Sequence, residues 1–94
     1  PREEDAFADH PARPLLVVEV AETSLAKDRG IKARLYAECG VPEYWIVNVA
    51  KRALEVYTQP VAGKYESIRV FAPGEIARPE AFPEVEVPVA VLFG

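Results

Sequence analysis

The sequence predicts an α/β fold, an α+β mixed sheet flanked by a helix, from three observations. An apolar run of strand length covers residues 15–22, and a helical segment follows over residues 25–39. A second segment, rich in aromatic and β-branched residues, covers residues 43–49. A strand, a helix and a second strand in this order form a βαβ unit, so we expect two parallel strands joined by a right-handed crossover.

The first predicted strand is apolar except for one carboxylate. Leu15–Ala21 contains only aliphatic side chains apart from Glu19. Such a run is typical of a strand that is buried on both faces. Because burying an isolated carboxylate is costly, Glu19 must be paired, hydrogen-bonded, bound to a metal ion or protonated. The residues expected in the core of the whole domain are Leu16, Val18, Val20, Leu35, Trp45, Val47 and Leu54.

The predicted helix is bounded by standard signals. Ser24 is a suitable N-cap residue, and Gly40 fits the position just after the helix end. Pro42 then closes the connection to the second strand. Gly30 lies inside the helix and carries a small cost to its stability.

The remainder of the chain predicts a β-meander. Residues 53–59 alternate between two faces and residues 64–71 read as a partner strand, with a turn at residues 60–63. The tail over residues 82–93 mixes Val, Pro and Glu, which favours edge strands or a short terminal helix. Residues 1–14 are polar and contain prolines, so they predict an irregular lead-in.

Composition bounds the class of protein. The 94 residues suffice for one domain, 1–94, and a chain that begins with Pro1 and contains no Met is expected to be a piece of a longer protein. The net charge of −4 argues against a general electrostatic grip on nucleic acid, although it permits a local basic stripe. Cys39 is the only cysteine, so we expect a reducing, cytoplasmic location. No apolar run reaches the length of a membrane span, so no membrane partner is expected.

Two interpretations of Glu19 stay open from the residues alone. It can reach solvent near the end of its strand, or form a structural ion pair with Arg13, Arg29 or Lys32. Alternatively, it belongs to a metal and phosphodiester site at the carboxyl end of the strand, where α/β sheets place ligands. In that case Lys32 could stabilise a phosphate oxygen or orient an attacking water.

The helix carries a stripe of three functional side chains. Asp28, Lys32 and Tyr36 are spaced four residues apart and therefore share one side of the helix. Ile31 and Leu35 are expected beside this stripe, facing the core. The simplest interpretation is an Asp28–Lys32 ion pair on a solvated face, which contributes little stability. In the alternative, Lys32 points back to the first strand.

Other chemically active side chains have ordinary structural explanations. Cys39 is expected to be a small buried helix residue rather than a nucleophile, because the single histidine, His10, lies in a predicted loop. Tyr44 and Trp45 are expected to pack in the core, with base stacking as the alternative. Four basic side chains crowd the helix and form either a solvated face or a contact with a phosphate backbone: Lys27, Arg29, Lys32 and Arg34.

Four blocks together form a long and specific pattern: Leu15–Leu25, Asp28–Lys32, Leu35–Ala37 and Gly40–Val47. This pattern resembles the Uma-type family of restriction endonucleases, within the PD-(D/E)XK nuclease superfamily, and the resemblance covers essentially the whole chain. It implies a restriction-endonuclease-like core that lacks its amino-terminal part. It also implies hydrolysis of phosphodiester bonds in nucleic acid, with DNA as the substrate and Mg²⁺ or Mn²⁺ as the cofactor.

The resemblance implies roles for two residues. Glu19 matches the second acid of the superfamily's metal site and is the expected metal ligand. Lys32 matches a catalytic lysine that has moved onto the helix, since its usual position, two residues after the acid, is Ala21 here. Asp28 and Tyr36 match recurrent family positions to which the resemblance assigns no role.

The superfamily's other metal-binding Asp lies in a Pro-Asp motif upstream of the acidic lead-in, outside this chain. Neither Asp5 nor Asp9 is expected to replace it, so we expect this fragment alone to be inactive. The alternative hypothesis is a non-catalytic remnant or protein-interaction module that retains the fold. An incomplete sheet would expose a strand edge, which predicts a homo-oligomer.

Overall fold

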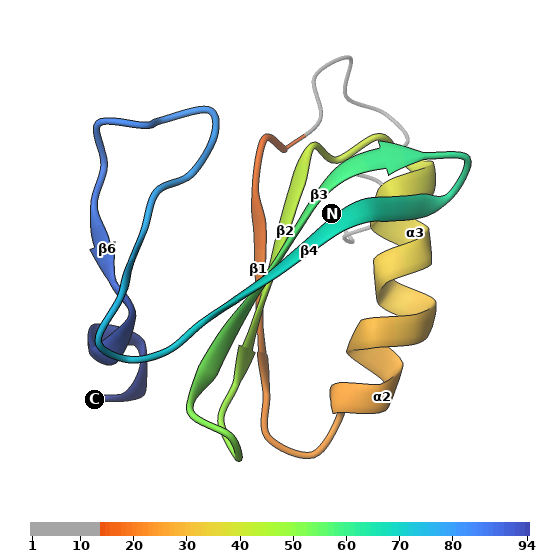
Figure 1. The fold of residues 1–94 in the computed structure, drawn as a ribbon. Coiled ribbons are helices and arrows are strands. Elements are labelled where there is room, and N and C mark those ends of the chain that lie inside the picture. The colour runs from red at the N-terminus through yellow and green to blue at the C-terminus, as the bar shows by residue number, and fades with distance from the viewer. Residues whose placement is uncertain (1–13) are drawn as a thin grey trace, which may run out of the picture.

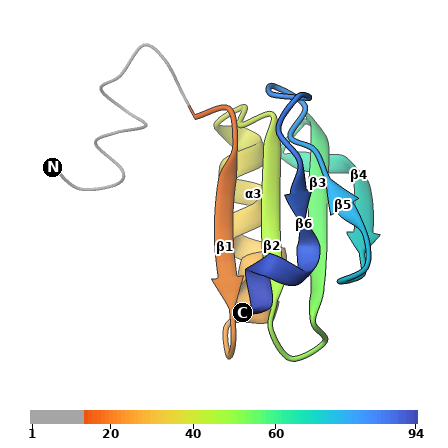
Figure 2. The ribbon, with the colours of Figure 1, turned by 90° about the vertical axis from the view of Figure 1, so that its left-hand side faces the viewer.

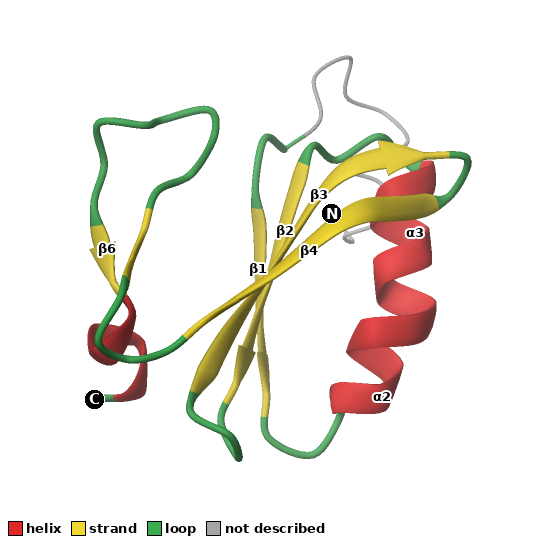
Figure 3. Cartoon of the chain, in the orientation of Figure 1, coloured by secondary structure: helices red, strands yellow, loops and turns green. Residues whose placement is uncertain are grey.

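The computed structural model describes residues 14–94 and shows a four-stranded sheet with a helix on one face and the carboxyl-terminal segment on the other (Figure 1). The strands lie side by side in chain order: β1 (Val17–Ala21), β2 (Glu43–Asn48), β3 (Ala53–Val61) and β4 (Lys64–Phe71). Figure 3 shows the same arrangement by secondary structure. The expected mixed α+β sheet is therefore confirmed.

Several expectations fall on residues 1–13, which lie outside the described part of the chain. These are the irregular lead-in, the placement of Asp5, Asp9 and His10, and an ion pair between Glu19 and Arg13.

The strand pairing follows the predicted topology. β1 pairs in parallel with β2, so that Glu19 lies opposite Ile46, and this confirms the βαβ unit. β2 pairs antiparallel with β3, and β3 pairs antiparallel with β4, which confirms the hairpin between residues 53 and 71. The hairpin loop is tighter than expected, because Val61 pairs with Lys64 across two residues only.

The helix is continuous from Leu25 to Glu38, close to its predicted bounds. It consists of α2 (Leu25–Lys27), a π-helical turn η1 (Asp28–Lys32) and α3 (Ala33–Glu38). The π-helical turn was not expected from the sequence. Gly40 adopts a φ of 77°, as expected of the residue after a helix end. Ser24 precedes the helix but makes no side-chain capping hydrogen bond.

Each face of the sheet has its own core. Tyr44 is the centre of the helix-side core, with ring centroids 4.9 Å from Tyr36 and 5.6 Å from Tyr57. Trp45 is buried in the core on the opposite face and donates a hydrogen bond from Nε1 to Glu43 at 2.8 Å. Both aromatic side chains are thus fully packed, which confirms the core interpretation and leaves neither available for base stacking.

The carboxyl-terminal segment covers the second core. A small antiparallel sheet, β5 (Ile76–Ala77) with β6 (Val87–Pro88), is followed by a 3₁₀ helix, η2 (Val89–Phe93). Figure 2 shows this segment lying across the sheet face opposite the helix. Both expected forms, edge strands and a short terminal helix, are therefore present. Among the described residues, no helix is long and apolar enough to cross a membrane.

The core was predicted correctly at the sheet centre and incorrectly at its margin. Trp45, Val47 and Leu54 are buried and Leu16 is half-buried, as expected. Three predictions of burial are wrong, because Val18 is 47% exposed, Val20 61% and Leu35 49%. The expected inward orientation of Ile31 is also wrong, since this side chain is 71% exposed.

The physical reason lies in the position of β1 and the rotation of the helix. Within residues 14–94, β1 is one of the two edge strands of the sheet, and its alternation directs Val18 and Val20 to the face that the carboxyl-terminal segment covers only in part. The helix turns Asp28, Ala33, Tyr36 and Ala37 toward the sheet, and this rotation directs Ile31 and Leu35 outward.

Candidate functional site

Glu19 points from β1 toward the helix, on the sheet face opposite Val18 and Val20. Lys32 Nζ lies 3.3 Å from Glu19 Oε1, and the Tyr36 hydroxyl donates a hydrogen bond to Glu19 Oε2 at 2.8 Å. The structure therefore brings the two predicted site residues into direct contact. Glu19 lies in the middle of β1 rather than at its carboxyl end, where it was expected.

Lys32 lies between two carboxylates. Its ammonium contacts Glu19 Oε1 and Asp28 Oδ1, each at 3.3 Å. Burial lowers the pKa of Lys32, but the hydrogen bonds and negative charges of Asp28 and Glu19 outweigh it and raise the pKa above its ordinary value. Lys32 is therefore protonated at neutral pH and carries a full positive charge toward the sheet.

Asp28 is fully buried, with 0% exposure, in the π-helical turn. The Ser24 hydroxyl donates to Oδ2 at 3.2 Å, and the Tyr44 hydroxyl donates to the main-chain oxygen of Asp28 at 3.1 Å. Within the described part of the chain, Oδ1 has no hydrogen-bond partner and contacts only Lys32, as an ion pair. The expectation of an Asp28–Lys32 pair is confirmed, but its placement on a solvated face is wrong.

A second buried carboxylate, Glu55 of β3, lies on the same sheet face as Glu19. Arg29 donates to both of its oxygens, from Nε to Oε1 at 3.0 Å and from a terminal nitrogen to Oε2. Tyr57 donates to Oε1 at 2.8 Å and Asn48 to Oε2 at 3.3 Å. Glu55 thus has four donors and no free acceptor directed at a ligand.

The surroundings of Glu55 keep it ionised. Burial raises the pKa of Glu55, but hydrogen bonds from Arg29, Tyr57 and Asn48 together lower it below its ordinary value. Because Arg29 is committed to Glu55, it is not the partner of Glu19, and this open alternative is wrong. Lys32 is the ion-pair partner of Glu19.

Sequence reasoning did not identify the burial of Asp28 or the closed network around Glu55. Two signals pointed to them. The four-residue spacing of Asp28, Lys32 and Tyr36 defined the helix side that faces the sheet. The alternation of β3 placed Glu55 with Tyr57 on one face.

The side chain of Glu19, the residue expected to bind a metal ion, is 25% exposed, so a ligand can reach it. Within residues 14–94, no group of three or more His, Cys, Asp or Glu side chains is arranged to hold a metal ion. Glu19 and Asp28 nevertheless fit a divalent cation in part, because each directs a carboxylate oxygen at the same nitrogen and the one on Asp28 is buried without a hydrogen bond.

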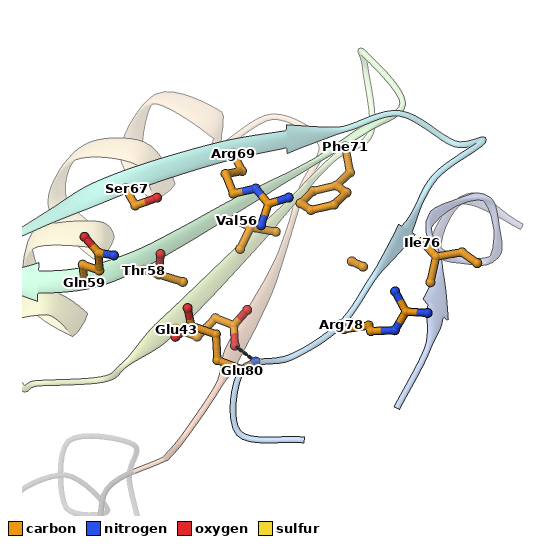
Figure 4. Close-up of a pocket in the computed structure, with 11 residues that line it drawn as sticks. Glu43, Val56, Thr58, Gln59, Ser67, Arg69, Phe71, Ile76, Arg78 and Glu80 are labelled. Atoms are coloured by element: carbon orange, nitrogen blue, oxygen red, sulfur yellow. Dashed lines mark hydrogen bonds between the residues drawn. The ribbon is translucent and has the colours of Figure 1, made fainter. Parts of the chain in front are cut away.

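A cavity of about 390 Å³ lies on the other face of the sheet, under the carboxyl-terminal segment. Figure 4 shows Thr58 and Arg69 on the sheet facing Arg78 on that segment. Glu43 closes one end, accepting a hydrogen bond from the main-chain nitrogen of Glu80 at 2.8 Å. This cavity is separated from Glu19 by the sheet and is not part of the candidate site.

A smaller hollow of about 270 Å³ lies between the helix and β4, on the same sheet face as Glu19. Three cationic side chains line it, from the helix and from the start of β4: Arg29, Arg34 and Lys64. Its floor includes the rings of Tyr57 and Tyr65. The helix face next to the candidate site is therefore locally basic, despite the net negative charge of the chain.

Comparison with known proteins identifies the family. The model of the Uma2 family, described as "Putative restriction endonuclease", matches residues 1–90 of the 94. No curated protein and no solved structure matches the chain. The mixed sheet with its single covering helix is consistent with a restriction-endonuclease-like fold. Since the match spans nearly every residue, the chain belongs to the Uma2 family.

Proposed function

We propose that this chain is part of a metal-dependent nuclease that hydrolyses phosphodiester bonds in DNA. Glu19 serves as a metal ligand, and Lys32 as the cation that stabilises charge on the phosphate. The observation that carries the proposal is the direct contact between Lys32 Nζ and Glu19 Oε1 at 3.3 Å, from two elements that only the fold brings together. Membership of a family of restriction endonucleases supports the same chemistry.

The residues support distinct parts of this chemistry. A bound divalent cation, Mg²⁺ or Mn²⁺, supplies charge neutralisation and a more acidic water. Lys32, protonated and 35% exposed, can donate a hydrogen bond to a phosphate oxygen on which negative charge develops. Tyr36 holds one oxygen of Glu19 and so fixes the orientation of that carboxylate.

The substrate class is supported by local charge. Lys27 and Arg34 are exposed on the helix, and Lys64 adds a third cation beside the hollow at β4. Exposed Lys and Arg side chains contact the phosphates of a nucleic-acid backbone and raise affinity without reading sequence. These residues therefore support binding of a phosphodiester strand along the helix.

A second candidate is a non-catalytic interaction module. Its supporting observation is a connected network that links the helix to β1 and is formed by Glu19, Lys32, Asp28 and Tyr36. Such a network can be purely structural. The two candidates differ in whether removing the Glu19 charge affects cleavage or only stability.

Plasmid nicking with Mg²⁺ and Mn²⁺ tests the proposal. It is measured for the 94-residue chain and for a chain extended upstream in the same reading frame. We expect very weak or no nicking by the first and metal-dependent nicking by the second. In the extended chain, Glu19→Gln and Lys32→Ala should each lower the rate by roughly a hundredfold or more.

The matched control is Glu66→Gln in the extended chain, which removes an exposed carboxylate on β4 and should leave nicking unchanged. Circular dichroism of each variant separates loss of chemistry from loss of fold. Full activity of the extended Glu19→Gln protein would remove the nuclease proposal and leave the interaction module.

A further inference from the structure

The Lys32 ammonium lies at the meeting point of two carboxylates from different elements. Glu19 extends from β1, and Asp28 from the π-helical turn, and each directs one oxygen to within 3.3 Å of Nζ. A position contacted by two carboxylate oxygens is a cation position. In this structure the chain itself supplies the cation.

Asp28 is unusual among the described acidic residues because it combines complete burial with an unsatisfied oxygen. Its side chain is 1% exposed, and among the described residues Oδ1 has no hydrogen-bond partner, only the ion-pair contact with Lys32 Nζ at 3.3 Å. Glu55, which is also buried, has donors on both oxygens. A buried carboxylate oxygen without a donor is costly unless a cation compensates it. Oδ1 therefore depends on whatever cation occupies this position.

The local charge favours a cation of higher valence. Two carboxylates against one ammonium leave a net charge of about −1. Arg29 does not change this balance, because it is paired with Glu55. Hard divalent cations prefer carboxylate oxygens and fill their remaining positions with water, so two protein carboxylates suffice for a weak site.

The backbone conformation of the helix also supports a cation site beside Asp28. The helix carries its π-helical turn at Asp28–Lys32 and is α-helical on both sides of it. Such turns occur mostly as single interruptions in α-helices and are frequent at functional sites. Here the turn contains the residue at each end of the buried ion pair, Asp28 and Lys32.

We propose that Asp28 is the second carboxylate ligand of a divalent-cation site shared with Glu19, and that Lys32 Nζ holds this position in the absence of the metal ion. The inference rests on the proposed metal-dependent function and adds to it a ligand within this chain. It assigns Asp28, to which the family resemblance assigns no role, to metal binding rather than only to an ion pair with Lys32.

The side chains can rearrange so that a divalent cation takes the position of Lys32 Nζ. Divalent oxygen sites have metal–oxygen distances of about 2.0–2.6 Å, so the carboxylates must approach by roughly 1 Å from their present contacts with Nζ. Glu19 and Lys32 are 25% and 35% exposed and have long side chains that can move. Asp28 is fixed by Ser24 and by its own burial, so the ion would be anchored at Asp28.

Binding of Mn²⁺ to the 94-residue chain, measured by electron paramagnetic resonance titration without nucleic acid, tests the inference. Glu19→Gln and Asp28→Asn should each weaken the affinity by roughly tenfold or more. Lys32→Met should strengthen it by roughly tenfold, because it removes the competing ammonium and leaves both carboxylates in place. Excess Mg²⁺ should displace the Mn²⁺.

Two exposed residues provide matched controls. Lys27→Met removes the same charge from the same helix without touching either carboxylate, and Glu66→Gln removes an exposed carboxylate on another element, β4. Both should leave the Mn²⁺ affinity close to that of the wild-type chain. If Asp28→Asn does not fold, the double variant Lys32→Met/Asp28→Asn is compared with Lys32→Met. The double variant removes both charges of the ion pair, so neither is left without its partner.

The outcomes separate this inference from the proposed function. Unchanged affinity on loss of the Asp28 carboxylate, in either background, overturns the inference and makes Asp28 a residue that positions Lys32. A Lys32→Met affinity no higher than that of Lys27→Met also overturns it. A further outcome is that the variants change the Mn²⁺ affinity as expected while the extended chain nicks no DNA. That result would uphold the cation site and remove the nuclease proposal instead.

Discussion

Glu19 and Glu55 lie in one row across the sheet, on either side of Ile46, yet the fold gives them different surroundings. The Glu55 side chain is 5% exposed and is held by Arg29 and two further donors. The Glu19 side chain is 25% exposed and shares its oxygens between Lys32 and Tyr36. One carboxylate is therefore closed off by the protein, and the other remains accessible to a ligand.

Glu55→Gln should destabilise the protein without affecting metal binding. The change removes the charge that accepts two hydrogen bonds from Arg29, and we expect a loss of about 1–3 kcal/mol in the free energy of unfolding. Urea denaturation measures the loss, with Glu66→Gln as the exposed control. A change no larger than that of the control would show that the Arg29 pair contributes nothing net.

The Arg29–Glu55 pair also predicts that the free energy of unfolding falls at acid pH. The folded pKa of Glu55 lies below its unfolded value, so its ionised form stabilises the fold above the unfolded pKa. This contribution is lost as the pH falls past the ordinary pKa of a glutamate and through the lower folded pKa of Glu55. The wild-type chain should therefore lose more stability between neutral and acid pH than Glu55→Gln. Parallel pH profiles would contradict this.

Tyr36→Phe should strongly lower the nicking rate of the extended chain and only slightly lower the free energy of unfolding. It removes the hydrogen bond to Glu19 Oε2, and the partly exposed carboxylate can take water instead, so we expect a loss of about 1 kcal/mol. The freed carboxylate should lower nicking by the extended chain by roughly tenfold, because its orientation is no longer fixed.

Tyr65→Phe is the matched control for Tyr36. Its hydroxyl donates to the main-chain oxygen of Val41 at 2.7 Å, away from Glu19. It should cost similar stability in urea denaturation and leave nicking unchanged. Equal effects of the two substitutions on nicking would mean that Tyr36 acts only through the fold.

We propose that the outer edge of β1 mediates self-association. Val18 and Val20 are 47% and 61% exposed on this strand, which within residues 14–94 has a partner on one side only. Sedimentation velocity should show concentration-dependent dimers, and Val20→Lys should abolish them. Val70→Lys, at an equally exposed position on β4, should not. A wild-type chain that stays monomeric at high concentration would contradict the proposal.

The β3–β4 loop predicts a stabilising substitution. Ala62 and Gly63 have φ values of 52° and 78°, the left-handed pair of a two-residue hairpin turn. Ala62→Asn should raise the free energy of unfolding by about 0.5–1 kcal/mol, because Asn tolerates this conformation better. Gly63→Ala should lower it by about 1 kcal/mol, since its Cβ would also lie 3.2 Å from Glu38 Cγ. Thermal or urea unfolding should show that Ala62→Asn stabilises the protein and that Gly63→Ala destabilises it.

The order of the elements and the parallel pairing of β1 with β2 follow from local sequence patterns. Aliphatic and aromatic runs predicted β1 and β2, and the βαβ rule then required them to be parallel, as observed. The spacing of Asp28, Lys32 and Tyr36 placed them on one side of the helix for the same local reason, the helical repeat. These features depend on residues that are close in sequence.

Only the tertiary structure decided which side of each element is covered. Val18 and Val20 are as apolar as Val47, but in the described part of the chain β1 is an edge strand and β2 lies between two neighbours, so only Val47 is buried. Likewise, a buried polar stripe on the helix displaced Leu35 outward because Glu19 offered Lys32 and Tyr36 partners across the interface. Pairing between distant residues offset the cost of burying charge, and local hydrophobicity carries no information about such partners.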